Sequence, residues 1–323
     1  MNSQLKILLK LLLPILLGVF LIYYSFSQMS LATLWEYAKT ADLKWIVLGV
    51  FCGFLSHLSR AYRWLYMAEP LGYKPKLANS FMAVYAAYLI NFTIPRAGEI
   101  ARATILSNYE KVPFEKGFGT IVSERIADMI MMLIIIGITL ILQFEFITDF
   151  FTSKINSSGT FAILAILIIV FGLGFVILKK STSRFAQKIK YFINGLIEGA
   201  LSIFKMKQKW LFILHTVFIW VMYVAMFYIT SFAIQDLNNI PLGAILIGFI
   251  LASFSIAATN GGIGSFPEAV VIGFLLFNLP EDPSRAFGWI MWSSQTIMII
   301  ILGGLSLLLL PVYNKQFAKK KLL

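Results

Sequence analysis

Residues that build most redox and metal sites are nearly absent from this chain. Its 323 residues include one cysteine, Cys52, and two histidines, His57 and His215. A single cysteine excludes an intramolecular disulfide, and neither histidine has a second ligand at the spacing of a metal site. We therefore expect no metal and no cofactor, and interpret these three side chains as packing or interface residues.

Charged residues are also scarce, at 13% of the chain, whereas 59% of the residues are hydrophobic and 29 are phenylalanine. A soluble domain of this length could not bury so much apolar surface. The composition therefore predicts an all-α polytopic membrane protein with one integral membrane domain over residues 1–323. The net charge of +12 does not indicate a nucleic-acid partner, because the basic residues follow the loops between apolar runs.

Six apolar runs are long enough, or nearly so, to cross a hydrocarbon core of about 30 Å. They cover residues 7–26, 43–58, 119–144, 160–178, 210–233 and 287–311. Two further runs, 78–106 and 241–279, carry proline and glycine near their middle. The first run has positive flanks but no small-residue cleavage site, which favours a retained membrane span over a removed signal peptide.

The distribution of lysine and arginine predicts how the two broken runs lie. If both are re-entrant hairpins, most basic residues fall on the cytoplasmic side, and the opposite side keeps only Lys39, Lys44, Lys154 and Arg285. If the first broken run crossed the membrane, the lysine-rich segment 179–209 would be translocated, against the positive-inside bias. We therefore expect six transmembrane helices, two re-entrant hairpins, and both termini on the cytoplasmic side of the cytoplasmic (inner) membrane.

Hairpins that enter from opposite sides indicate a possible inverted repeat, with halves at about 43–144 and 210–311. The tips "NFTIPRAGE" (91–99) and "NGGIGSFPE" (260–268) place Asn, Ile and Glu at the same offsets, but three matches in nine residues can arise by chance. Between the halves, residues 184–206 are expected to form an amphipathic helix on the cytoplasmic surface, as a connector or as a lipid sensor.

Ionisable side chains inside a membrane are costly, so they are candidates for function. Seven lie in the hairpins or at the start of the third span, and two asparagines lie at the hairpin tips: Arg96, Glu99, Arg102, Glu124, Arg125, Asp128 and Glu268, with Asn91 and Asn260. Three positive and four negative charges almost cancel. Residue chemistry therefore leaves two interpretations open: a structural ion-pair network, or a substrate-binding site in which an anionic headgroup displaces a carboxylate from an arginine.

The backbone at the hairpin tips favours the binding site. Helix-breaking residues occur at membrane depth, where irregular backbone is tolerated only if protein buries it or it lines a wet cavity: Pro95, Gly98, Gly261, Gly262, Gly264 and Pro267. Half-helices that begin near Arg96 and Pro267 would direct partial positive charge into that cavity. Arg60 and Arg63, at the end of the second span, are headgroup or interface residues, and an interface anchor is the simpler interpretation.

Four motifs resemble the lysylphosphatidylglycerol synthase transmembrane family of flippase-like membrane proteins. They are "RAYRW" (60–64), "NFTIPRAGEIARA" (91–103), "SERIADM" (123–129) and "NGGIGSFPEA" (260–269). The resemblance implies a lipid-binding polytopic fold that, in the best-known members, moves an aminoacylated phospholipid between leaflets. We expect a short form without the C-terminal aminoacyltransferase domain. Thr259 and Asn260 depart from the family pattern, in which a proline commonly precedes the glycine pair.

Together these features predict translocation of an anionic or modified phospholipid, or of a lipid-linked headgroup, through a polar cavity in the membrane. Arg96 and Arg102 would bind phosphate, and the expected partner is a membrane phospholipid. The alternative is a membrane enzyme, or the subunit of a lipid-modifying enzyme, that acts on a lipid-linked substrate. Because no catalytic constellation is present, we expect that the protein is not an enzyme.

Overall fold

The computed structural model describes residues 3–94, 96–146, 148–149, 183, 187 and 206–320. Within these ranges all regular structure is helical, which confirms the predicted all-α fold class. Three predicted features lie outside the described residues: the span at 160–178, the conformation of Pro95, and most of the amphipathic helix at 184–206. Of that helix only residues 187 and 206 are described.

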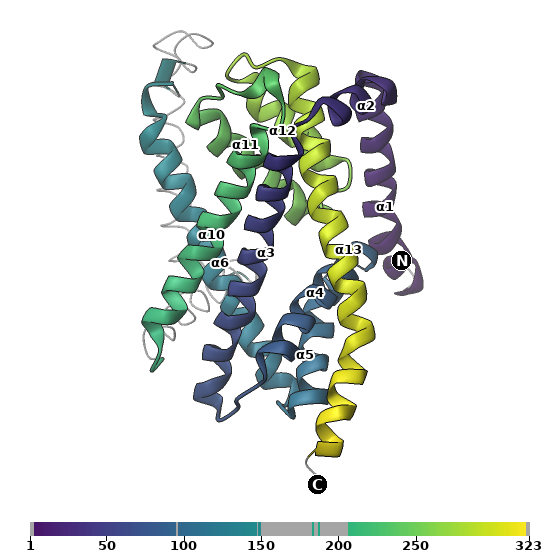
Figure 1. Ribbon diagram of the computed structural model, residues 1–323, viewed down its shortest axis with the longest axis vertical. Helices are drawn as coiled ribbons and strands as arrows, with labels where there is room; N and C mark the ends of the chain where they lie inside the picture. Colours follow the sequence, from purple (N-terminus) through teal and green to yellow (C-terminus); the bar gives the residue numbers. More distant parts are fainter. Residues whose placement is uncertain are drawn as a thin grey trace. The chain divides into compact units, whose positions relative to one another are not determined.

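The helices follow the predicted order of intact and broken runs (Figure 1). The first part of the chain forms α1 (Ser3–Gln28), α2 (Leu31–Thr40), α3 (Leu43–Ala68), η1 (Glu69–Leu71), α4 (Leu77–Thr93), α5 (Ala97–Glu110) and α6 (Phe114–Leu142). The last part forms α10 (Lys209–Ser231), η2 (Gln235–Leu237), α11 (Leu242–Ala258), α12 (Ser265–Leu275) and α13 (Glu281–Lys320).

Within the described residues, α3, α6, α10 and α13 are long and apolar enough to cross a membrane. The pair α1 and α2, bent by 79° at their break, could supply a fifth span. Two helices are longer than the apolar runs at 43–58 and 287–311 that predict them. Hydropathy ends the run before Arg60, but α3 continues because that side chain is buried by protein.

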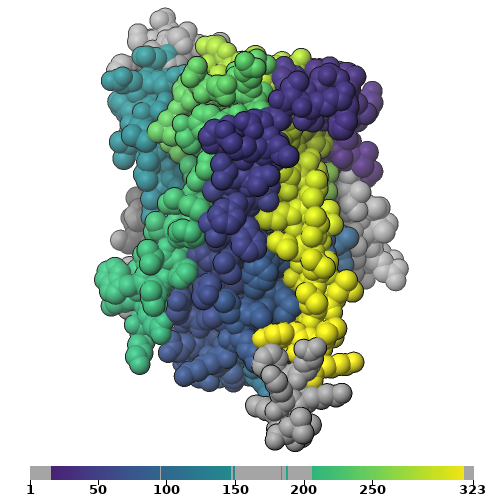
Figure 2. Space-filling model, in the orientation of Figure 1, coloured from purple at the N-terminus to yellow at the C-terminus, as the bar shows by residue number. Residues whose placement is uncertain are grey.

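The chain divides into two compact units. Unit 1 consists of Met1–Glu124 and Lys207–Leu323, and unit 2 of Arg125–Met206. In unit 1, α3 packs along α10 and also contacts α13, and Figure 2 shows α3 between these two helices on one face of the unit. A Cβ at Gly49 would overlap the hydroxyl of Thr230, so glycine on α3 lets α10 approach closely.

Two hairpins of short helices lie at opposite ends of unit 1 (Figure 1): α4 with α5 where α3 ends, and α11 with α12 where α13 begins. The helices have 17, 14, 17 and 11 residues. At 1.5 Å per residue they are about 17 to 26 Å long, shorter than a hydrocarbon core of about 30 Å. Both breaks occur where the sequence predicts them.

The tip of the first hairpin is closed by Asn91. Its side-chain oxygen accepts a hydrogen bond of 2.7 Å from the backbone N–H of Gly98, in the first turn of α5. A Cβ at Gly98 would overlap the carbonyl oxygen of Ala87 on α4, so only glycine permits this approach. Arg96, just before α5, adopts a left-handed conformation with φ 60°.

The second hairpin is closed in a different way. The hydroxyl of Thr259 accepts a hydrogen bond from the N–H of Gly262 (3.2 Å) and lies 2.9 Å from the hydroxyl of Ser265. Gly261, Gly262 and Gly264 all have positive φ, and Trp292 donates a hydrogen bond to the carbonyl oxygen of Gly261. The matching offsets of Asn91 and Asn260 therefore do not correspond to the same local contact.

We predict that Gly98→Ala lowers the stability of the purified protein by about 2 kcal/mol, because the added methyl group must push α5 away from backbone atoms of α4. Thermal melting in detergent measures the effect. The matched control is Gly119→Ala on α6, where no described atom lies within 4 Å of the added Cβ. Equal melting temperatures for the two variants would contradict the close packing of the hairpin.

Candidate functional site

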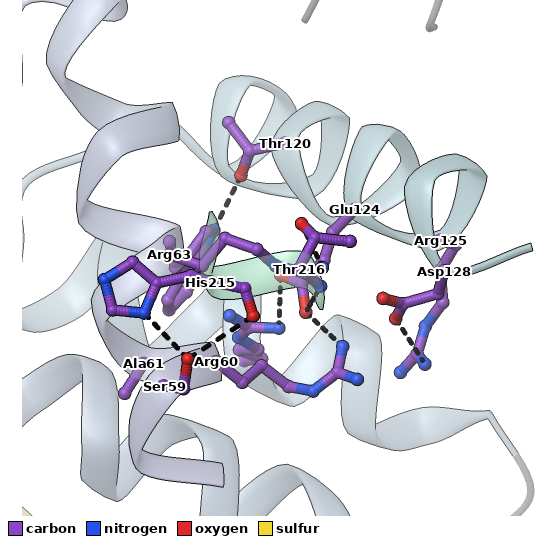
Figure 3. Close-up of polar contacts among 12 residues, drawn as sticks. Ser59, Arg60, Ala61, Arg63, Thr120, Glu124, Arg125, Asp128, His215 and Thr216 are labelled. Carbon is purple, nitrogen blue, oxygen red and sulfur yellow. Dashed lines mark hydrogen bonds and ion pairs between the residues drawn. The ribbon is translucent and has the colours of Figure 1, made fainter. Parts of the chain in front are cut away.

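The site is a cluster of three arginines around one glutamate, which we call the arginine cluster: Arg60, Arg63, Arg102 and Glu124. Glu124 Oε1 lies 2.5 Å from Arg60 Nη1 and 3.0 Å from Arg63 Nη2, and its Oε2 lies 3.0 Å from Arg102 Nη1. Figure 3 shows Arg60 and Arg63 of α3 directed toward Glu124 of α6. All four side chains are buried, with exposed fractions of 3% or less.

The burial of Arg60 and Arg63 corrects the interpretation of these residues as interface anchors. They are three apart and therefore share one face of α3, and this face packs against α10 rather than against headgroups. Arg63 Nη1 donates to the hydroxyl of Thr216 (3.0 Å), and Arg60 Nη2 donates to the hydroxyl of Tyr223 (3.4 Å). Both guanidinium groups are thus positioned by α10 and by Glu124.

Arg102 comes from α5, in the first hairpin, and is held by Trp64 of α3. Its guanidinium carbon lies 3.9 Å from the centre of the indole ring, a cation–π contact. The indole N–H donates to Thr120 (2.8 Å), which lies one turn before Glu124 on α6. The arginine cluster therefore ties the hairpin helix α5 to α3 and to the first turns of α6.

Among these four side chains, positive charge exceeds negative charge. One carboxylate forms ion pairs with three guanidinium groups, so these four side chains carry a formal charge of +2. Each guanidinium has five N–H donors, whereas a carboxylate has two oxygens. Charges buried away from water are stable only when counter-charges and hydrogen bonds compensate them. Glu124 is therefore a shared counter-charge of all three guanidinium groups.

The other ionisable candidates of the first hairpin and of α6 differ in exposure. Arg96 is exposed, and Glu99 is half-buried in the first turn of α5. Arg125 and Asp128, in unit 2, pair with each other at 3.9 Å, and the Arg125 side chain is 46% exposed. Phosphate binding by Arg96 stays a prediction, whereas Arg60 and Arg63 lie beside Arg102 at Glu124.

Glu268, in the second hairpin, pairs with Arg285 at the start of α13. Arg285 Nε donates to Glu268 Oε1 (3.0 Å) and Nη2 to Oε2 (3.3 Å), while Nη2 also reaches Glu281 Oε1 (2.8 Å). Arg285 is 1% exposed. The carboxylate of Glu268 thus holds this guanidinium inside the protein.

The end of unit 1 where α13 begins also carries an open depression of about 740 Å³. Three carboxylates line it, those of Asp236, Glu281 and Asp282, together with Tyr37 and two prolines. In the described part of the chain, no three histidine, cysteine or acidic residues are grouped closely enough to hold a metal ion. The hairpin of α4 and α5, which carries Arg102 of the arginine cluster, lies at the opposite end of unit 1 (Figure 1).

Fold and site together define a polytopic α-helical membrane protein with a buried cationic cluster beside a broken helix. Residues 11–303 match the family described as "Lysylphosphatidylglycerol synthase TM region", and the chain belongs to that family. A similar protein is the UPF0104 membrane protein MJ1595 of Methanocaldococcus jannaschii. It is 23% identical over 309 residues, which cover 86% of this chain and 87% of that protein. The family predicted from the four sequence motifs is thus confirmed.

Proposed function

We propose that the protein moves a phospholipid with an anionic headgroup between the two leaflets, and that the arginine cluster binds the phosphate of that headgroup. The observation that carries this proposal is the sharing of one carboxylate, Glu124, by three buried arginines. Membership of a family described by a lipid synthase membrane region agrees with a lipid as the substrate.

A phosphodiester fits this cluster in both geometry and charge. Guanidinium groups present paired N–H donors that match two phosphate oxygens, which is why arginine is common at phosphate sites. One bound phosphodiester, with a charge of −1, would lower the formal charge of the four side chains from +2 to +1. The phosphate would compete with Glu124 for the same donors, so binding would loosen the ion pairs that join α5 to α6.

The position of Arg102 on a hairpin suggests how binding leads to movement. Arg60 and Arg63 belong to the long helix α3, whereas Arg102 belongs to the short helix α5. A phosphate that takes the place of Glu124 at Arg102 would free this hairpin from α6. In our proposal the α4 and α5 hairpin opens toward the cytoplasm, where both termini lie, and the α11 and α12 hairpin serves the other leaflet as its inverted counterpart.

We predict that Arg102→Gln slows lipid exchange roughly tenfold to a hundredfold, the loss expected for one charge-assisted hydrogen bond to phosphate. Glu124 keeps its pairs with Arg60 and Arg63, so the variant should fold. The purified protein is reconstituted into liposomes that contain phosphatidylglycerol with a fluorescent acyl chain. Addition of dithionite quenches the outer leaflet, and the slow phase of quenching then reports exchange.

The control is Lys116→Gln, which removes an exposed basic residue near the start of α6. It should exchange lipid within about twofold of the wild-type rate. If Arg102→Gln is folded and also exchanges lipid at the wild-type rate, the arginine cluster is not the phosphate site. Lipid mass spectrometry of a deletion strain tests the alternative of an enzyme: loss of a chemical species would favour it over transport.

A further inference from the structure

The short helix α2 lies at the end of unit 1 where α3 and α13 begin (Figure 1). The last residue of α1, Gln28, comes just before it, and α3 begins just after it, at Leu43. α2 also contacts α13, and its Tyr37 lines the same depression as Glu281 of α13. α2 is therefore at the level where three long helices of unit 1 begin or end.

α2 turns away from the direction of α1. α1 has 26 residues, about 39 Å at 1.5 Å per residue, which exceeds a hydrocarbon core of about 30 Å. The hydroxyl of Ser30 accepts a hydrogen bond of 3.0 Å from the N–H of Thr33 and caps a new helix at the bend of 79°. The 10 residues of α2 then advance only about 3 Å along the axis of α1. α1 alone is thus long enough to cross a membrane, and α2 runs nearly at right angles to it.

The side chains of α2 fall on three faces, because 3.6 residues complete one turn. One face is partly buried against the protein: Thr33, Leu34 and Tyr37. The exposed remainder has an apolar face of Leu31, Trp35 and Ala38 and a polar face of Glu36 and Thr40, with Ala32 and Lys39 between them. A helix that exposes separate apolar and polar faces fits a boundary between lipid and water.

The apolar face also has the composition of a membrane interface. Leu31 and Trp35 are 65% and 61% exposed, and tryptophan is typical of the level where acyl chains meet headgroups. Lys39 Nζ lies 5.5 Å from the centre of the Trp35 ring and 3.0 Å from Glu36 Oε1, so this cation links the edge of the apolar face to the polar face. Tyr23 of α1 and Leu43 of α3 are exposed as well, so exposed apolar surface precedes and follows α2 along the chain.

We propose that α2 is an interfacial helix, whose apolar face binds the lipid surface of the membrane and whose polar face contacts water. The partner is the lipid of the leaflet at the α13 end of unit 1. The apolar face of such a helix enters about 5 to 10 Å into the boundary between headgroups and acyl chains. This inference does not depend on the proposed function, because the arginine cluster involves the other hairpin.

An anchored α2 fixes the depth of α1, which packs on the tip of the second hairpin. A Cβ at Gly264 in that tip would lie 2.8 Å from the backbone nitrogen of Ile22 on α1. Trp289 of α13 donates a hydrogen bond of 2.9 Å to the hydroxyl of Ser25, which holds α1 in this place. Irregular backbone at membrane depth requires protein cover, and α1 supplies cover here. The anchor thus sets the position of a helix that covers the second hairpin.

Spin labels on the full-length protein in liposomes of phosphatidylcholine and phosphatidylglycerol test the inference. In a Cys52→Ala background, single cysteines are introduced at exposed positions of the apolar face (Leu31→Cys, Ala38→Cys) and of the polar face (Glu36→Cys, Thr40→Cys). Power saturation compares the collisions of each label with oxygen, which concentrates in lipid, and with a water-soluble nickel chelate. We expect an oxygen-to-nickel collision ratio about threefold higher on the apolar face, because its labels lie inside the lipid boundary.

Two further variants carry the label at Ala38→Cys. Trp35→Glu places a charge on the apolar face and should lower the collision ratio about twofold, whereas Glu36→Gln, on the polar face, should leave it unchanged. Similar ratios on both faces would overturn the inference: high nickel contact at all four positions would place α2 in water, and low nickel contact at all four would place it in the membrane core. Protection of the apolar-face labels from both oxygen and nickel would also overturn it, because a protein, such as a second copy of this chain, would then cover that face.

Discussion

Glu124→Gln is expected to unfold the protein at a temperature roughly 10 °C below that of the wild type. The substitution removes the shared carboxylate and leaves three buried guanidinium groups next to one another. Breaking one buried ion pair by removal of a single partner costs about 3 to 5 kcal/mol. Here the repulsion among Arg60, Arg63 and Arg102 adds to that cost. Thermal melting in detergent, followed by tryptophan fluorescence, measures the shift.

Two further variants separate the loss of the ion pairs from a general effect on α6. Glu115→Gln changes an exposed glutamate on the same helix and should leave the melting temperature within about 2 °C. The double variant Arg63→Met with Glu124→Gln removes one of the repelling charges and should recover part of the loss. A Glu124→Gln protein as stable as Glu115→Gln would show that the carboxylate does not hold the cluster together.

The helices and their breaks could be predicted from the sequence because they depend on local properties. Long apolar runs are enough to indicate membrane-length helices. The break between α11 and α12 contains Gly261, Gly262 and Gly264, which readily adopt positive φ, and Gly98 and Pro267 lie in the first turns of the helices that follow the two breaks. The length of α3 was underestimated, since hydropathy alone cannot show that Arg60 is buried by protein.

The arginine cluster could be predicted only in part. Glu124 and Arg102 stand out as charges within apolar runs. Arg60 and Arg63 do not, because an arginine pair at the end of a span is typical of a membrane interface, and Glu124 lies 64 residues from Arg60. One signal was available: His57 and Arg60 lie on the same face of α3, so the polar surface continues into the span instead of stopping at its end.

Each hairpin forms a buried ion pair with the helix that follows it, but the acidic and basic partners are exchanged between the two hairpins. In the first, α5 supplies Arg102 and the next helix supplies Glu124. In the second, α12 supplies Glu268 and the next helix supplies Arg285. Both pairs fix a short helix to the helix that follows it, and both are buried. Because the signs are opposite, the anion of our proposal would compete for the hairpin residue in the first pair but not in the second.

We predict that Arg285→Met destabilises the protein by about 3 kcal/mol. Glu268 then loses its bidentate partner, and its carboxylate stays buried. The melting temperature of the purified protein measures the change. Glu281→Gln is the matched control: it also removes a bond to Arg285, but the Glu281 side chain is 49% exposed, so its loss should cost less than about 1 kcal/mol.

Removal of both partners should restore most of the stability. In the double variant Glu268→Met with Arg285→Met, no charge is left buried, and apolar side chains of similar length fill the space between α12 and α13. The double variant should therefore melt at a higher temperature than Arg285→Met alone. If it melts lower, the two side chains contribute independently, and the pair does not act as the link that fixes α12 to α13.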